Sequence, residues 1–265
     1  MKTRIISVIL VVAAAGIMYG VSQIIDRGSE PLVNEVEIEN SVEATNESIA
    51  AVKAEVEDDV GVEDVDKAGE VTQEVLIPEE HYLDIPFTPQ APHAEWEMPY
   101  QEACEEAAIM MAARYLQGRV IEDEDDADRA ILQLVDYGES IGYPIDTTAA
   151  ETADTLTRFY DLETEVIYSF SWDDVKSEVA QGHPVILPAA GRLLENPNYT
   201  EPGPLYHMLV VKGFSPEHVI TNDPGTKNGL DYKYEYDLLF NAVHDWNGGD
   251  VENGAKAMIV VREAS

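Results

Sequence analysis

YQEACEEAAIMMAARY, the stretch from Tyr100 to Tyr115, decides the fold of this chain because it contains the only cysteine and begins a helix. After Cys104 it consists of good helix formers, and no glycine or proline interrupts it before Gly118. Cys104 is therefore expected in the first turn of a helix, where free backbone N–H groups and the positive end of the dipole favour a thiolate. A thiolate is the attacking species in cysteine catalysis.

Two residues far downstream have the chemistry to complete such a site. His207 heads an apolar run about a hundred residues after the cysteine, and Asp223 follows in the segment NDPG. Cysteine, then histidine, then a carboxylate or amide is the chain order of papain-like enzymes. A lone cysteine is more often a small buried hydrophobic residue. The downstream pair is what favours catalysis.

His207 competes with five other histidines for the role of base. It is preferred because it leads a predicted strand, which is a rigid mount for a base. A helix-end turn is expected at His183 and a hairpin at His218. The remaining candidates are His81, His93 and His244. Asn222 is an alternative to Asp223, since neighbouring strand residues point to opposite faces and only one of them can serve.

Helical patterns come first in the folded part of the chain, and extended patterns follow. Helices are predicted at 104–117, 127–137, from just after Asp146 to 160, at 171–182 and at 238–246. Asp146 is expected to cap the third of these helices, and Ser171 and Asp174 are expected to form a capping box at the start of the fourth. Strands are predicted at 83–87, 163–168, 184–189, 208–214, 218–221, 229–236 and 256–262. This order predicts an α+β fold of the papain-like type, with N-terminal helices packed on a mostly antiparallel sheet.

Residues 1–26 are expected to form a transmembrane anchor. Lys2 and Arg4 precede an uncharged stretch from Ile5 to Ile25, and about 20 apolar residues suffice to span a bilayer. The alternative is a signal peptide cleaved near the alanines at 13–15. Both interpretations place the rest of the chain outside the cytoplasm, because the basic residues stay inside.

Residues 27–80 are strongly acidic and lack aromatic residues, which predicts a disordered linker. The folded domain, 81–265, is also acidic, with 34 acidic and 11 basic side chains. A protein that binds nucleic acid presents a basic surface, so nucleic acid is excluded as a partner.

No metal or cofactor is predicted for this chain. The acidic run 122–126 lacks the glycine and the closing glutamate of a calcium loop. One cysteine and the absence of a His-Glu-x-x-His motif exclude the usual zinc sites. No glycine-rich phosphate loop occurs either.

Five short blocks carry a resemblance to a known family. They are IPFTPQ at 85–90, CEEA at 104–107, QGHPVI at 181–186, HMLVVKGF at 207–214 and NDPG at 222–225. In this order, over nearly the whole domain, they resemble the papain-fold cysteine peptidases related to bacteriocin-processing, double-glycine leader peptidases.

The resemblance implies a role for each of four residues. Cys104 would be the nucleophile, and His207 the base that activates it and then protonates the leaving amine. Asp223 would orient the imidazole. Gln90 would donate its side-chain amide to the oxyanion, beside the backbone N–H of Cys104.

Two features depart from this pattern or compete with it. Glu105 follows the cysteine where the closest bacteriocin processors commonly have a glycine, and a carboxylate beside the sulfur opposes thiolate formation. Gln101 is an alternative oxyanion donor, although three residues upstream of Cys104 is a poor reach.

The expected function is that of a membrane-tethered extracytoplasmic cysteine peptidase. It would hydrolyse peptide or amide bonds, including those of cell-wall peptides, through a Cys-His-Asp triad and an acyl-enzyme. One alternative is an inactive module of the same fold that binds peptides or cell-wall material, an interpretation favoured by Glu105. Another is a cell-wall amidase or transpeptidase, with His218 as a second histidine.

Overall fold

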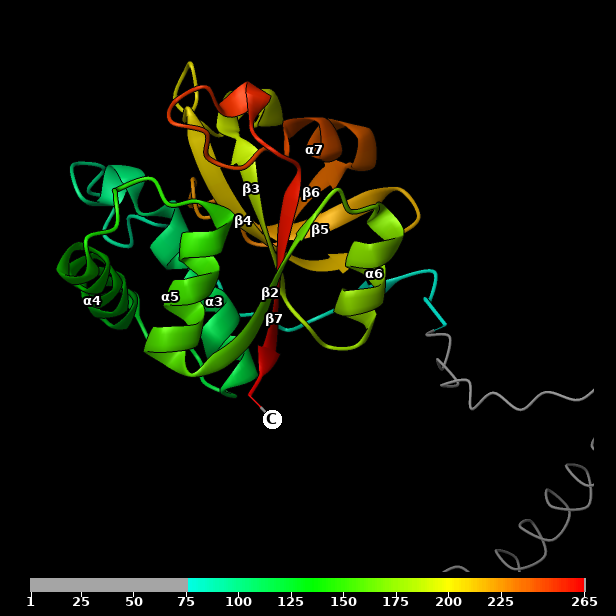
Figure 1. Cartoon of the computed structure of the whole chain (residues 1–265), viewed down its shortest axis with the longest axis horizontal. Coiled ribbons are helices and arrows are strands. Elements are labelled where there is room, and N and C mark those ends of the chain that lie inside the picture. The colour runs from blue at the N-terminus through cyan, green and yellow to red at the C-terminus, as the bar shows by residue number, and fades with distance from the viewer. Residues whose placement is uncertain (1–75, 265) are drawn as a thin grey trace, which may run out of the picture. The chain divides into compact units, whose positions relative to one another are not determined.

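A computed structural model describes residues 76–264 of the chain (Figure 1). The predicted anchor at 1–26 lies outside the described residues, as does the linker at 27–80 except for its last five residues. Within 76–264, no helix has both the length and the apolar character needed to cross a bilayer.

The described part of the chain has the predicted α+β arrangement. Three consecutive α-helices precede most of the strands. The order is β1 (His81–Tyr82), η1 (Tyr100–Glu102), α3 (Cys104–Leu116), α4 (Glu124–Ile141), α5 (Ala149–Tyr160), β2 (Leu162–Tyr168), α6 (Trp172–Ala180), β3 (Val185–Ala190), η2 (Gly191–Leu194), β4 (Tyr206–Phe214), β5 (His218–Asn222), β6 (Tyr232–Glu235), α7 (Tyr236–Ala242), η3 (Val251–Asn253) and β7 (Ala257–Glu263). The η elements are short 3₁₀ turns.

The strands form one antiparallel sheet in the order β2-β7-β3-β4-β5-β6, with β1 paired to the far end of β4. Figure 1 shows α3, α4 and α5 grouped to one side of the strands, with α6 and α7 to the other. The C-terminal end of β3 lies beside the N-terminal end of β4, and Ala189 of β3 pairs with His207 of β4 there. This pairing places His207 at the start of a fully buried strand.

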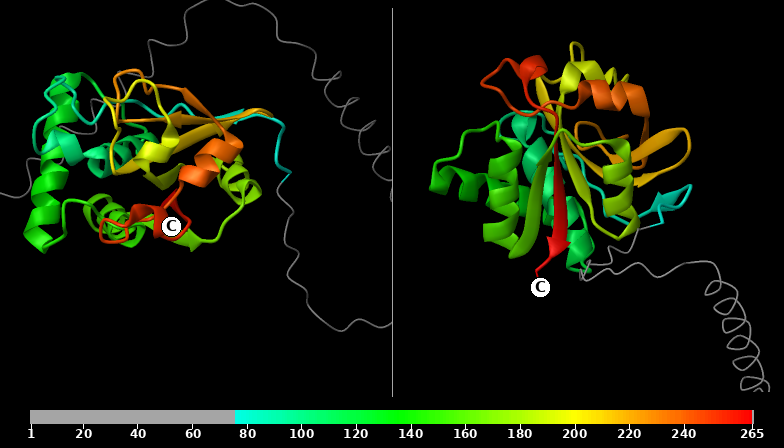
Figure 2. Two further views of the ribbon diagram at one scale, coloured as in Figure 1. Left: turned by 90° about the horizontal axis from the view of Figure 1, so that it is seen from above. Right: turned by 45° about the vertical axis from the view of Figure 1, so that its right-hand side comes forward.

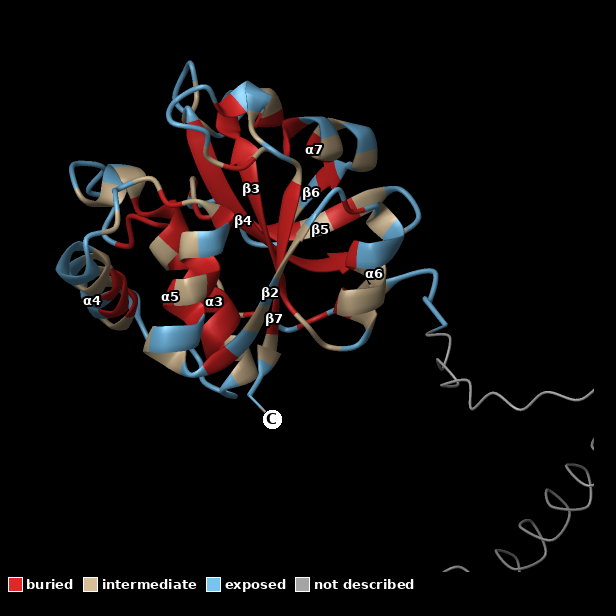
Figure 3. Ribbon diagram, in the orientation of Figure 1, coloured by how far each residue is buried: buried red, intermediate tan, exposed pale blue. Residues whose placement is uncertain are grey.

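Helix α3 is the central helix of the domain. Met110, Met111 and Ala112 are completely inaccessible to solvent, and the helix packs against β4 and β3. In Figure 3 the buried colour covers α3 and the central strands, whereas the outer face of α4 is exposed. Figure 2 shows the same layers from two further directions. The apolar run after Cys104 therefore anchors the cysteine to the core.

Side-chain caps start α4, α5 and α6. Ser171 and Asp174 form the predicted capping box of α6. The prediction that Asp146 caps the third helix is wrong, because Thr148 and Glu151 form a complete capping box two residues further on. Asp123 caps α4, which therefore begins three residues before the predicted start.

The predicted strand at 83–87 is also wrong. Side chains of the central strands occupy the backbone acceptors of this segment, so no ladder forms. Lys212 Nζ and Asn222 Nδ2 both donate to the Ile85 carbonyl oxygen, at 3.0 Å and 3.1 Å, and Asn222 also donates to that of Pro86. The segment is held in place by these buried donors, and strand pairing is limited to His81 and Tyr82.

Candidate active site

Cys104 is the first residue of α3, as predicted, but its sulfur is not free. The side chain is buried, and Sγ donates a hydrogen bond of 2.9 Å to Oε2 of Glu105. The other carboxylate oxygen, Oε1, accepts the backbone N–H of Thr147 at 3.1 Å. Both oxygens of Glu105 thus act as acceptors, one from the thiol and one from the backbone.

The surroundings of the sulfur oppose the expected thiolate. Burial raises the pKa of the Cys104 thiol well above its usual range, and the charge and hydrogen bond of Glu105 raise it further. A hydrogen bond from the backbone of Met208 acts in the opposite direction. Burial also raises the pKa of the Glu105 carboxyl. Burial and Glu105 therefore both favour the thiol over the thiolate at Cys104.

Magnitudes explain why the helix dipole does not prevail at Cys104. A dipole end contributes about 0.3–2 kcal/mol to the stability of a nearby charge. Two full like charges about 4 Å apart repel by roughly 4 kcal/mol at an effective dielectric constant near 20. Glu105 follows the cysteine in the sequence and accepts a hydrogen bond from its sulfur. Repulsion by a negative charge at this position outweighs the favourable effect of the helix dipole on a thiolate.

His207 and Asp223 are brought together as the sequence predicted. The Nε2 atom of His207 lies 2.8 Å from Oδ1 of Asp223, and both side chains are buried. With Nε2 engaged by the carboxylate, the other ring nitrogen, Nδ1, is left to accept a proton. Among the described residues, no hydrogen bond joins His207 to Cys104, and the sulfur interacts instead with the backbone of Met208, the residue after His207.

Asp223 is held by an unusual number of donors. Oδ1 also accepts the backbone N–H of Gly225 at 3.0 Å. Oδ2 accepts the hydroxyls of Tyr234 and Tyr199 at 2.6 Å and 2.7 Å, and the amide of Asn196 at 2.9 Å. Burial alone would raise the pKa of Asp223, but His207 and these donors lower it to about 2.

The residues around Asp223 were not found from the sequence. Asn196, Tyr199 and Tyr234 come from the loop after η2 and from β6, and no local pattern marks them. Only Gly225, in the block NDPG, stands close enough in sequence to Asp223 to be noticed. Tyr199 also packs edge-on against the ring of His207, with the ring centroids 5.6 Å apart.

Gln90 is near the site but its amide is occupied. The side chain is buried, and Nε2 donates to the carbonyl oxygens of Tyr100 and Gln101 at 2.9 Å and 3.0 Å. Two carbonyl acceptors require the NH₂ group, so neither N–H is free for an oxyanion in this conformation. Its Oε1 atom is buried without a partner. Gln101 is exposed and donates to Glu102 instead.

The competing candidates lie elsewhere. The amide of Asn222 donates to the carbonyl oxygens of Ile85 and Pro86, so it does not contact His207. His183 pairs with Glu178, and His244 contacts the Gly254 carbonyl. The other histidines are on β1 (His81), beside the first two residues of α4 (His93), and at the start of β5 (His218).

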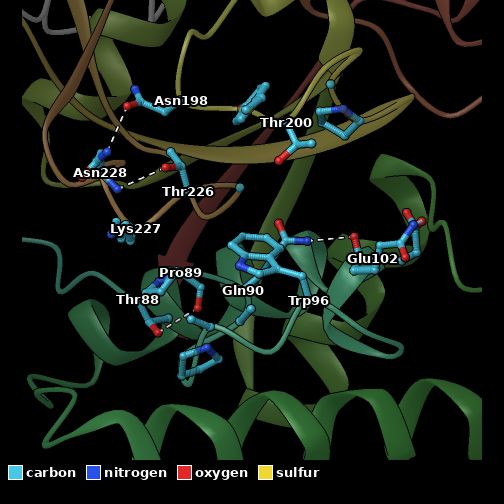
Figure 4. A pocket seen from close by; sticks show the side chains of 18 of the residues that line it. Thr88, Pro89, Gln90, Trp96, Glu102, Asn198, Thr200, Thr226, Lys227 and Asn228 are labelled. Atoms are coloured by element: carbon cyan, nitrogen blue, oxygen red, sulfur yellow. Dashed lines mark hydrogen bonds between the residues drawn. The ribbon is translucent and has the colours of Figure 1, made fainter.

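A wide groove of about 1300 Å³ runs past this site. One wall comes from residues 87–102, and Figure 4 shows Gln90, Trp96 and Glu102 on it. The opposite wall comes from residues 192–206 and 225–228, where Figure 4 shows Asn198 and Lys227. We call this the wide groove.

Gly225 brings the wide groove within reach of the imidazole. Neither Cys104 nor His207 lines the groove, but Gly225 does. A Cβ atom added at Gly225 would lie 2.9 Å from Cε1 and 3.2 Å from Nε2 of His207. Only a glycine therefore fits between the ring and the groove. Tyr206, which precedes His207, lines the groove as well.

No metal site accompanies this arrangement. Among residues 76–264, no group of three or more histidine, cysteine or acidic side chains has the geometry to hold an ion.

Comparison with known proteins assigns the chain to a family. The model of the peptidase C39-like family matches residues 82–248, which is more than half of the chain and contains Cys104, His207 and Asp223. The chain belongs to the peptidase C39-like family. Membership confirms the resemblance noted in the sequence and supports a cysteine peptidase.

One solved structure similar to this C39-like chain comes from Bacillus anthracis and is assigned as a C39-like peptidase. The two share 16% sequence identity with a TM-score of 0.49, over 71% of this chain and 100% of the other. No curated protein matches the chain.

Proposed function

We propose that this protein is a peptidase that cleaves peptide or amide bonds with Cys104 as nucleophile, His207 as base and Asp223 as the residue that orients the imidazole. The observation that supports this most strongly is the 2.8 Å contact between His207 and a carboxylate that four further donors keep ionised. A fixed carboxylate holds the imidazole in one tautomer and stabilises the imidazolium that forms during the reaction.

The chemistry needs only groups of this chain and water. Cys104 transfers its proton to Nδ1 of His207, and the sulfur attacks the substrate carbonyl carbon. The imidazolium protonates the leaving amine as the C–N bond breaks, which leaves an acyl-enzyme. Water, deprotonated by the imidazole, then releases the acid and restores the thiol.

The hydrogen bond between Cys104 and Glu105 defines the resting state in this proposal. The sulfur must leave Glu105 before its proton can pass to His207. Substrate in the wide groove would promote this step by displacing water and adding contacts near Tyr206 and Gly225, which line the groove next to the site.

We also propose that the substrate is a peptide, such as a cell-wall peptide, and that the domain works outside the cytoplasm on a membrane tether. Both charge signs line the wide groove, with Arg192 and Lys227 on one wall and Glu102 and Asp123 on the other. An extended peptide offers complementary groups to both walls. The tether rests on the apolar stretch at 5–25. Protease treatment of intact cells should remove the domain, and alkaline washing should leave it with the membrane.

An electrophilic peptide probe tests the triad. We expect the native full-length protein to be labelled at Cys104 near neutral pH, and we expect His207→Ala to reduce the labelling rate at least about a hundredfold, because general-base assistance is lost. Intact-mass measurement follows the reaction, and the half-buried residue His218 at the start of β5 provides a matched control, His218→Ala. Equal labelling of the wild type and His207→Ala would contradict the triad. No labelling of either would favour the binding module.

A further inference from the structure

A second, smaller pocket lies directly behind the nucleophile. It has a volume of about 90 Å³ and is enclosed by η1, α3, α4 and the segment 143–147. Glu105, which holds the Cys104 sulfur, and Glu106 line it from α3. Glu102 lines both this pocket and the wide groove. We call it the Glu106 pocket.

Glu106 carries an unused acceptor in this pocket. Its Oε2 atom is buried and has no hydrogen-bond partner. Buried polar atoms nearly always have a partner, because leaving one unpaired costs about 1–3 kcal/mol or more. A free carboxylate oxygen shut off from water is therefore a strong sign that a donor belongs there.

The pocket is rich in carboxylates and poor in cations. Glu102, Glu105, Glu106 and Glu139 line it, and among its described lining residues there is no arginine, lysine or histidine. Of these, Glu105 and Glu106 are shielded from water, and burying acidic groups without a counterion is costly. A cation entering the pocket would remove this cost, whereas an anion or a neutral group would not.

The mouth of the pocket is apolar. Met98 and Ile145 line it and are 54% and 58% exposed, which is high for side chains of this kind. Pro99 and Pro144 add further apolar surface. Acidic groups inside and an apolar mouth match a side chain with an aliphatic stem and a positively charged end.

We propose that the Glu106 pocket binds a lysine side chain of the substrate, so that the enzyme selects peptides with lysine close to the scissile bond. The inference rests on the proposed peptidase function. The stem of the lysine would lie between Met98 and Ile145, and its ammonium group would donate to Oε2 of Glu106. Glu105 lines the pocket and accepts a hydrogen bond from the Cys104 sulfur, so the pocket lies next to the reacting atoms.

Size favours lysine over larger cations. A cavity of roughly 150 Å³ is needed to hold a ring the size of benzene. At about 90 Å³ the Glu106 pocket suits a narrow, unbranched chain. The planar guanidinium of arginine is broader than an ammonium group and needs a fork of acceptors, so arginine should be accepted less well.

The preference should depend on pH. Burial raises the pKa of Glu106 to about 7. The titratable groups that face it are Glu102 from η1, Glu105 from α3, and Glu139 and Tyr143 from α4 and its exit. All of them are acidic, so none can supply the missing positive charge. Lysine stays protonated below about pH 10. Selection for lysine should therefore strengthen as the pH rises from about 6 to 8 and Glu106 ionises.

Matched peptides test the proposal on the full-length protein. Each set differs only at one position near the cut, which holds lysine, arginine or the neutral norleucine. We expect kcat/KM for the lysine peptide to exceed that for norleucine at least about tenfold. Glu106→Gln should reduce this ratio to about two or less, and because each ratio is taken within one variant, any general change in rate cancels. Glu217→Gln, on the exposed turn before β5, should retain the full ratio.

A binding measurement separates this inference from the peptidase proposal. n-Butylammonium, which mimics the lysine side chain, should raise the Tm of the wild type at pH 8 and should not raise that of Glu106→Gln. This holds even if no peptide is cleaved. Equal cleavage of lysine and norleucine peptides would overturn the inference. So would a Tm that rises with calcium chloride and not with butylammonium, since the pocket would then be a metal site.

Discussion

Replacing Asp223 by asparagine is expected to lower the free energy of unfolding by roughly 3–5 kcal/mol at pH 7, the usual cost of breaking a buried charge pair. The carboxylate is fully buried and accepts hydrogen bonds from His207, Gly225, Tyr199, Tyr234 and Asn196. An asparagine keeps the shape but has no charge, and its NH₂ group would face donors in place of an acceptor.

The pH dependence of this loss follows from the pKa of Asp223, which lies at about 2 in the folded protein. A lowered carboxyl pKa stabilises the fold above the unfolded value, near 3.8, and the contribution is lost as the pH falls to about 2. This part amounts to about 2–3 kcal/mol. The difference between the wild type and Asp223→Asn should therefore shrink by about 2 kcal/mol between pH 5 and pH 2, as measured by urea denaturation.

Asp154 is a suitable control for this experiment. It also accepts from a tyrosine and pairs with a cationic neighbour, since Tyr143 and Arg158 donate to it at 2.6 Å and 2.8 Å. Because this cluster lies at the surface, Asp154→Asn should cost about 1 kcal/mol or less. Equal losses for the two variants, or a loss at Asp223 that does not vary with pH, would show that the five donors do not act as described.

Replacing Glu105 by glutamine is expected to increase the rate at which iodoacetamide alkylates Cys104 at pH 7 by about tenfold or more. The change removes the negative charge that raises the pKa of the thiol and weakens the hydrogen bond from Sγ. Glutamine retains an oxygen for the Thr147 N–H, so the local fold should persist. The rate should be followed across pH 6–9 by mass spectrometry, and the profile should move to lower pH.

Two outcomes would contradict this account of Glu105. An unchanged rate would mean that burial alone controls the thiol. A slower rate would mean that Glu105 accepts the thiol proton and assists ionisation. Glu217→Gln again serves as the control, because Glu217 is exposed and lies on the turn between β4 and β5.

Local patterns in the sequence predicted much of the secondary structure. The helix after Cys104, the capping box at Ser171 and most strands of the sheet depend on interactions within a few residues. Such patterns failed where distant side chains intervened. At 83–87 the alternation indicated a strand, but Lys212 and Asn222 occupy the carbonyl group of Ile85.

The candidate site was predictable in part. His207 and Asp223 stand in blocks whose order along the chain is informative, and they contact each other in the structure. The ionisation of the Cys104 sulfur was not predictable, although the sequence places an acidic residue, Glu105, directly after the cysteine. Its effect depends on burial, which a sequence does not reveal. Gln90 illustrates the same limit, since its amide is used by carbonyl groups 10 and 11 residues away.

By itself the sequence determined which residues have the chemistry to react and where α3 must begin, because these depend on residue type and on neighbours along the chain. Only the tertiary structure decided what each of those residues contacts. It closed the core around Cys104 and Glu105, gathered three distant side chains around Asp223, and left the Glu106 carboxylate without a partner. The reason is physical: the ionisation of a buried group depends on its solvation and on nearby charges, and both arise when segments far apart in the chain pack together.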